Sequence, residues 1–173
     1  RFAKMKGLHS MKSATGSAEI DISPLTFEKG ALQPSDLVTI FDPTLILTGE
    51  IKPDTNLNWS SKGLTGKARI NLANLSMKTD TGELTNLNGT PDIDELFPLT
   101  ISRPQQLSAA RAVAGIALQQ PNLSFRVLTK EGSPVLYIDR MTVGVVGGSA
   151  FIDHAVIDTG AAVNRVTVQL TSL

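Results

Sequence analysis

The stretch Thr65-Gly66-Lys67-Ala68-Arg69-Ile70-Asn71-Leu72-Ala73-Asn74-Leu75 decides the fold class. In it the apolar residues Ala68, Ile70 and Leu72 alternate with charged or polar ones. Because successive side chains of a β-strand point to opposite faces, this alternation predicts a strand with one apolar and one polar face. One-sided strands are typical of antiparallel sheets, so we expect an antiparallel sheet rather than βαβ units.

The same alternation recurs along most of the chain. It is found at residues 17–22, 45–51, 123–127, 136–138 and 165–170. Turn signals such as Asn88-Gly89 and Glu131-Gly132 separate these runs at short intervals, which favours hairpins and meanders. We therefore predict an all-β protein, mainly antiparallel, in which residues 1–173 form a single domain built as a curved sheet or an open β-groove.

Helices are expected in two short places only. Ser35 to Phe41 is predicted to be helical, with Ser35 as its N-cap and Pro43 ending it. A second short helical turn is expected over Asp92 to Phe97. Two such helices cannot cover the apolar face of a long sheet, so a second sheet, strong curvature, a neighbouring domain or a lipid has to do so.

Composition excludes several classes of function. The 173 residues include 16 Lys plus Arg and 16 Asp plus Glu, and this zero net charge argues against nucleic acid as a partner. No cysteine is present, which removes disulfides, thiolate zinc sites and cysteine nucleophiles. No apolar run is long enough to span a membrane. No phosphate loop, dinucleotide fingerprint or serine nucleophile elbow occurs, so no cofactor is expected.

The sequence Asp-Thr-Gly occurs twice and raises the alternative of a pepsin-like or retropepsin-like aspartic protease. Such an enzyme would use Asp80 and Asp158 as a pair of carboxylates that share one proton. Asp158 follows an apolar strand, as a catalytic loop would, whereas Asp80 lies among polar residues. The competing interpretation is that both sequences are ordinary hairpin turns, which we favour.

The other polar candidates have ordinary interpretations. His9 and His154 are the only histidines, and a metal site at His154 would need ligands from other strands, so we expect no metal. Arg1, Lys4, Lys6 and Lys12 make the start of the chain basic. We interpret that stretch as a strand edge kept soluble by lysine rather than as a membrane-binding patch.

From Asn58 to Leu170 the order of features resembles a known family. The features are the run Gly66–Ser76, Leu84-Thr85-Asn86-Leu87-Asn88-Gly89, Leu96-Phe97-Pro98, Pro104-Gln105-Gln106-Leu107, Gly115-Ile116-Ala117-Leu118, Phe125 in a strand, Gly147-Gly148-Ser149-Ala150 and a closing alternating strand. This order is similar to the C-terminal domain of YdbH-type proteins, a branch of the AsmA-like group that includes TamB. Residues 1–56 do not contribute to the resemblance.

The resemblance implies a location and a role. Proteins of this group lie in the periplasm of Gram-negative bacteria, anchored in the inner membrane by a segment not in this chain, and their open β-groove carries phospholipid acyl chains toward the outer membrane. We therefore expect this chain to be a fragment of a longer envelope protein and to act without enzymatic chemistry. The remaining alternative is a structural or partner-binding β domain with a closed core.

The apolar positions of the alternating strands are the expected lining of such a groove. They are Ile70, Leu72, Leu107, Val113, Leu123, Phe125, Val127, Ile138, Val166, Val168 and Leu170. Because the last strand ends at Leu173 without a closing turn, we also expect an open sheet edge and edge-to-edge self-association of the fragment.

Overall fold

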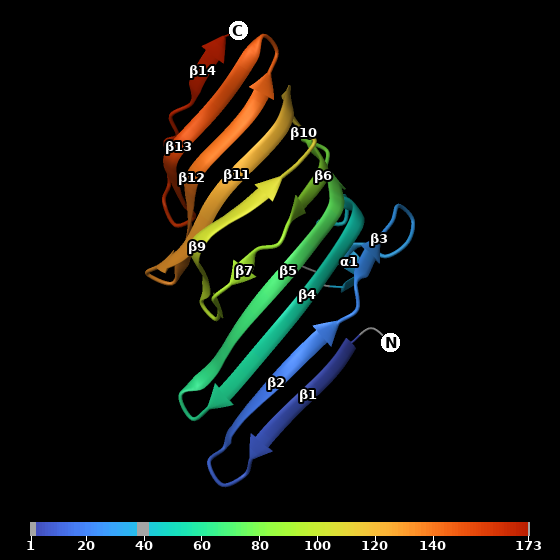
Figure 1. Ribbon diagram of the computed structural model, residues 1–173, viewed down its shortest axis with the longest axis vertical. Coiled ribbons are helices and arrows are strands. Elements are labelled where there is room, and N and C mark those ends of the chain that lie inside the picture. Colours follow the sequence, from blue (N-terminus) through green and yellow to red (C-terminus); the bar gives the residue numbers. More distant parts are fainter. Residues whose placement is uncertain (1–2, 38–41, 173) are drawn as a thin grey trace.

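A computed structural model describes residues 3–37 and 42–172 of the chain as one antiparallel sheet of 14 strands (Figure 1). The sequence-based prediction of an all-β, antiparallel fold is therefore confirmed. The strands are β1 (Ala3–Ser10), β2 (Thr15–Ile22), β3 (Leu25–Phe27), β4 (Ile46–Ser60), β5 (Gly63–Lys78), β6 (Glu83–Gly89), β7 (Asp92–Ile93), β8 (Glu95–Leu96), β9 (Leu99–Ser108), β10 (Arg111–Ala114), β11 (Ile116–Lys130), β12 (Ser133–Val145), β13 (Gly148–Asp158) and β14 (Gln169–Ser172).

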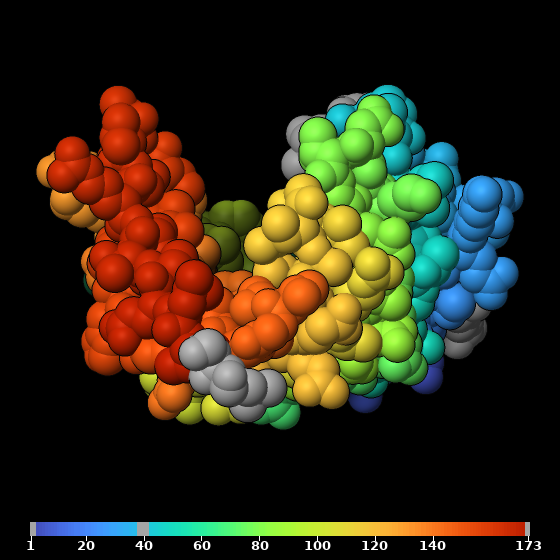
Figure 2. Space-filling view, turned by 90° about the horizontal axis from the view of Figure 1, so that it is seen from above, coloured from blue at the N-terminus to red at the C-terminus, as the bar shows by residue number. Residues whose placement is uncertain are grey.

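The strands follow one another across the sheet almost in chain order. The main path is β1-β2-β4-β5-β6-β10-β11-β12-β13-β14, and the short strands β3 and β7 pair beside β4 and β5. β9 joins β6 to β11 below β10. Viewed from above, the sheet curves into a trough, with the C-terminal strands in orange and red on one side of a hollow and β5 and β6 in green on the other (Figure 2).

The core consists of two apolar clusters. The first contains Ala68, Ile93, Ile101 and Phe125, and the second contains Phe27, Leu47 and Leu75. Ile70 and Leu123, which stand two residues from Ala68 and Phe125 along β5 and β11, pack against the first cluster, so they share its face of the sheet. We call this the inner face, and we call the opposite, polar face the outer face.

Residues with positive φ let the inner face remain apolar where the alternation would otherwise break. Asn74 in β5 and Asn86 in β6 have φ of 49° and 54°, and the registers of their strands shift beside them. Gly49, opposite in β4, has φ of 108°, and a Cβ there would lie 2.5 Å from the carbonyl oxygen of Asn74. Because each β-bulge inserts one extra residue, Leu75 and Met77 point to the same face as Leu72.

The described residues contain one helix, in the predicted region. α1 (Pro34–Leu37) starts one residue before Ser35, and residues 38–41 of the expected helix lie outside the described part of the chain. Ser35 is therefore not the N-cap. Instead the Gln33 backbone N–H donates to Asp36 Oδ2 at 2.8 Å, which satisfies a donor in front of the helix.

Two further sequence predictions are wrong. Asp92 to Phe97 is not a helical turn, because its residues form β7 and β8, which pair with β5 and β9. The closing strand is also shorter than expected. Residues 163–168 have no strand structure, and only Gln169–Ser172 pair with β13. The alternating pattern at 165–170 lacks a neighbouring strand over most of its length, and alternation without a pairing partner does not make a strand.

An aromatic contact holds the outermost hairpin to the sheet. His9 of β1 is the register partner of Gly16 in β2, and Gly16 is the partner of Trp59 in β4. The Trp59 indole lies over Gly16, where a Cβ would overlap it, and its Nε1–H donates to His9 Nδ1 at 3.1 Å. The rings of His9 and Trp59 are stacked with centroids 6.1 Å apart. The clasp therefore connects β1 to β4 across β2.

Candidate functional site

One line of register partners crosses the inner face and is apolar throughout. Each member is the direct partner of the next on eight neighbouring strands, from β3 to β13. The members of this apolar row are Leu25, Ile51, Leu72, Gly89, Leu107, Leu123, Met141 and Ile152. Because neighbouring strands are about 4.8 Å apart, the seven steps of the row span about 34 Å.

The apolar row is partly exposed along its whole length. Every member is half-buried, neither sealed in the core nor fully exposed. The row stays continuous at Gly89 because the Leu107 side chain lies over it; a Cβ on Gly89 would be 2.5 Å from Leu107 Cδ2. Partly exposed apolar side chains that adjoin one another in a line form a surface that an elongated apolar ligand can cover.

A cavity of about 330 Å³ lies on this face, where the row crosses β9, β11 and β12. Its size falls within the range of small-molecule pockets. Leu107, Leu123 and Met141 of the row contribute to it, and apart from Ser108 its lining residues are apolar. The other lining residues are Met77, Leu84, Leu87, Ala109, Ala112 and Pro121. A cavity with this lining offers dispersion contacts and no charged partner.

The structure brings most of the expected lining residues to the inner face. Leu107 and Leu123 line the cavity. Ile70 and Val127 pack against the cluster that contains Phe125, and Leu72 packs against the second cluster. Ile138, the register partner of Phe125, is buried. Phe125 and Ile138 are thus core residues of the inner face, next to the row along β11 and β12.

Four expected lining residues lie away from both the cavity and the core. Val113 follows Ala112, which lines the cavity, so Val113 lies on the opposite face of β10. Val166, Val168 and Leu170 are 40%, 52% and 73% exposed, at or just before the short strand β14. Val166 and Val168 precede β14 and have no paired neighbouring strand to position them. Leu170 pairs with Ala150, two residues from Ile152 of the row, so it lies on the inner face at the outermost strand.

Sequence reasoning missed other residues of the site, including Met77, Leu87 and Met141. Strict alternation from Leu72 places Asn74 and Ser76 on the inner face, but the bulge at Asn74 replaces them by Leu75 and Met77. In the sequence this appears as a step of three between Leu72 and Leu75, which is a usable signal for a bulge. The pairing of β9 with both β6 and β11, which aligns the row, has no local sequence signal.

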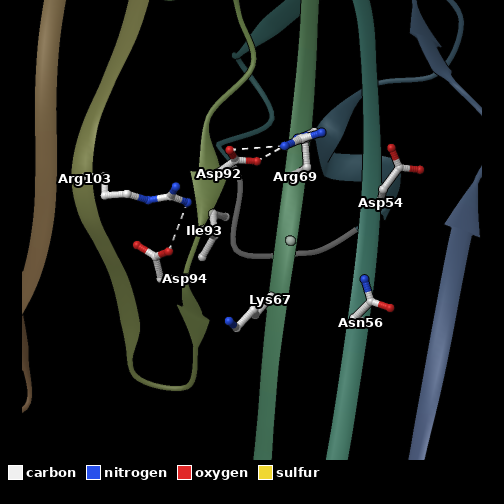
Figure 3. A pocket seen from close by; sticks show the side chains of 9 residues that line it. Asp54, Asn56, Lys67, Arg69, Asp92, Ile93, Asp94 and Arg103 are labelled. Carbon is white, nitrogen blue, oxygen red and sulfur yellow. Dashed lines mark hydrogen bonds and ion pairs between the residues drawn. The ribbon is translucent and has the colours of Figure 1, made fainter.

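The outer face carries ion pairs instead. Arg69 Nε donates to Asp92 Oδ1 at 2.7 Å, and Arg103 lies 3.5 Å from Asp94 in a polar pocket of about 360 Å³ (Figure 3). The Arg69 hydrogen bonds lower the pKa of Asp92, and hydrogen bonds from Ser102 lower that of Asp94. Arg69 and Arg103 thus pair with Asp92 and Asp94 in this pocket, which Lys67 also lines.

A second ion pair of this kind joins β11 to β12. Arg126 Nη2 donates to Asp139 Oδ1 at 2.6 Å, and the guanidinium lies over the Tyr137 ring at 5.5 Å. The hydrogen bonds from Arg126 lower the pKa of the Asp139 carboxyl.

The two Asp-Thr-Gly sequences occupy separate turns. Asp80 lies in the turn between β5 and β6, whereas Asp158 ends β13 and accepts the Gly160 N–H at 2.8 Å. In the sheet β10, β11 and β12 stand between these hairpins, so the structure does not bring the two carboxylates together. His154 lies in β13 with φ of 57°, far along the sheet from His9.

Over residues 3–37 and 42–172, no group of three or more His, Asp or Glu residues is arranged to hold a metal ion. Within the same ranges no helix is long and apolar enough to cross a membrane.

Comparison with known protein families identifies a family for this chain. The family model described as "YdbH-like: Intermembrane phospholipid transport protein YdbH" matches residues 3–173. Neither the curated proteins nor the solved structures contain a significant match.

Proposed function

Because this chain belongs to the YdbH-like family of intermembrane phospholipid transport proteins, we propose that its inner face binds the acyl chains of phospholipids along the apolar row. The observation that carries the proposal is the row itself, with eight apolar register partners that all remain half-buried. The trough seen in Figure 2 leaves this face open to a ligand.

The physical basis is burial of hydrocarbon without specific polar contacts. Each methylene that leaves water contributes about 0.8 kcal/mol, so a chain of many methylenes binds an apolar surface without a head-group site. The polar head then remains at the open side of the trough, in water. Such binding is spread over area, so no single residue of the row is essential.

We further propose that the domain works in the periplasm as part of a protein anchored in the inner membrane outside this chain. In this role it needs no catalytic group and no cofactor. Movement of a lipid along an apolar surface makes and breaks no covalent bond, and the paired charges of the outer face stay out of contact with the lipid.

The proposal is tested by placing a photo-crosslinking amino acid at Leu123 of the row and, in a second variant, at Asn122. These neighbours occupy the same strand but point to opposite faces. After incubation with vesicles of phosphatidylethanolamine and phosphatidylglycerol and illumination, we expect phospholipid adducts at Leu123 and few at Asn122, as measured by mass spectrometry.

Equal labelling at both positions would remove the assignment to the inner face. Absence of adducts at Leu123, with a native fold by circular dichroism, would favour the structural or partner-binding alternative. The same variants can be placed in the full-length protein in cells, where the Leu123 site should again capture phospholipid.

We also propose that the isolated chain associates edge to edge. Within the described residues β1 pairs only with β2 and β14 only with β13, so both outer strands present unpaired backbone groups. Open strand edges pair readily with another strand, including one from a second copy.

A further inference from the structure

The apolar row is not equally open at its two ends. At the β3–β5 end Leu25, Ile51 and Leu72 pack against the cluster of Phe27, Leu47 and Leu75. Leu32, from the segment that follows β3, packs against the same cluster. Toward β12 and β13 the row members Met141 and Ile152 belong to neither core cluster. Residues 25–37 therefore add side chains over one end of the row only.

A single side-chain amide fixes this segment in place. Gln33 Oε1 accepts the Leu47 N–H at 2.8 Å, while Gln33 Nε2 donates to the Leu47 carbonyl at 3.1 Å. The carbonyl oxygens of Glu28 and Leu32 also lie within hydrogen-bond distance of Nε2, at 2.7 Å and 2.9 Å, so its two hydrogens are shared among the three carbonyls. The half-buried amide thus joins both backbone groups of Leu47 to the segment, and the adjacent Pro34 is buried.

The position of the cavity agrees with this asymmetry. Met77 and Leu87 line the cavity and also pack against the covered cluster, so they form the cavity wall on that side. Met141 lines the opposite side, on β12, toward the C-terminal wall of the trough. A chain that enters across Met141 therefore meets Met77 and Leu87, with residues 25–37 behind them.

We propose that residues 25–37, held by Gln33, form a stop at the β3–β5 end of the apolar row and limit the length of acyl chain that it accepts. This inference rests on the proposed function, because it assigns a length limit to the same site. The ligand class is a single saturated hydrocarbon chain that enters from the β12–β13 side and ends against Met77 and Leu87.

The test measures the affinity of the chain for a series of saturated fatty acids of increasing length. In the wild-type protein each added methylene should raise the affinity about fourfold, the equivalent of about 0.8 kcal/mol, until the chain reaches the stop. Beyond that length the affinity should become constant. In Gln33→Ala and in Leu32→Ala the rise should continue to longer chains.

Asn164→Ala is the matched control. Its amide also joins both backbone groups of one residue, since Oδ1 accepts the Asp158 N–H at 2.8 Å and Nδ2 donates to the Asp158 carbonyl at 3.0 Å. These Asn164 hydrogen bonds lie on the far side of the sheet from the row's covered end, so this variant should keep the wild-type length limit.

Hydrogen exchange at the Leu47 amide shows independently whether Gln33→Ala has released the segment. Faster exchange with an unchanged length limit in both test variants would overturn the stop while leaving lipid binding intact. A wild-type affinity that does not rise with chain length would overturn the proposed function, and the stop with it. Leu32→Ala keeps the hydrogen bonds between Gln33 and Leu47, so it tests the stop even if Gln33→Ala fails to fold.

Discussion

Gly89 is the one member of the apolar row without a side chain, and the structure shows why. A Cβ there would lie 2.5 Å from Leu107 Cδ2 and 2.7 Å from the Gln106 carbonyl oxygen. In Gly89→Ala the Leu107 side chain has to leave its place in the row. We expect a loss of about 1–3 kcal/mol in the free energy of unfolding, from overpacking, together with fewer lipid adducts at Leu123.

Gly82→Ala separates these two effects. A Cβ at Gly82 would also lie 2.7 Å from a carbonyl oxygen, that of Val113, but Gly82 is outside the row. It should therefore lose similar stability in urea denaturation and keep the wild-type yield of adducts. Equal loss of adducts in both variants would mean that the yield reports stability rather than the continuity of the row.

The ion pair of Arg126 and Asp139 gives stability a dependence on acid. Because hydrogen bonds from Arg126 hold the folded-state pKa of Asp139 below its ordinary value of 3.8, the unfolded chain binds more protons in that range. The contribution of Asp139 is thus complete above about pH 4 and is lost as the pH falls through the folded-state pKa.

Asp139→Asn should accordingly be less stable than the wild type near neutral pH, and the gap should narrow on acidification. Urea denaturation at several pH values measures it. Arg126→Gln removes the cause of the lowered pKa, so the difference in stability between this variant and the wild type should also narrow on acidification. A gap that stays constant down to the lowest pH would show that the pair contributes no such dependence.

At the scale of single elements, the bulge in β5 decides which side chains reach the inner face. Asn74→Val keeps the residue count but disfavours the positive φ of the bulge, and a regular strand of that length would turn Leu75 and Met77 outward. Leu75 is buried in the second cluster, so the variant must either keep a strained backbone or lose that burial, and we expect a cost of about 1–3 kcal/mol in the free energy of unfolding. Urea denaturation of Asn74→Val checks this.

Asn74→Gly is the companion variant, because glycine adopts the same positive φ without strain. It keeps the residue count of the bulge and should stay within about 1 kcal/mol of the wild type. An Asn74→Val variant as stable as Asn74→Gly would mean that the positive φ at this position is not needed to keep Leu75 and Met77 on the inner face.

The elements also show how far the sequence could be interpreted. Alternation identified β5, β11 and β12 correctly. Each of these strands is paired on both sides, so its apolar side chains pack against those of its neighbours on one face of the sheet. It failed at residues 165–168, where no neighbouring strand is paired. The helical turn predicted over Asp92–Phe97 was wrong because two very short strands carry too few residues to show a period. Alternation alone pointed to Leu107 and Leu123, which line the cavity. It did not point to Met77 and Met141, because bulges and non-local pairing place them there.

At the scale of the whole molecule, the open outer strands determine how the isolated chain behaves in solution. We expect sedimentation velocity to show association that increases with protein concentration. The backbone N–H groups of β1 point alternately to β2 and to the open edge, so one of the variants Lys6→Pro and Gly7→Pro removes an N–H from the edge. That variant should weaken association if the edge is used. A strict monomer at every concentration would contradict the proposal.

The clasp of Trp59 on His9 has a consequence for spectroscopy. Trp59 is the only tryptophan, so the tryptophan emission of this protein reports one hairpin at the β1 side of the sheet. A fatty acid bound at Leu123 should leave that emission unchanged, whereas detachment of β1 and β2 should alter it before the rest of the sheet unfolds. Fluorescence and circular dichroism melting curves of this protein should therefore not coincide, and their difference would record the unzipping of an edge rather than an error in either measurement.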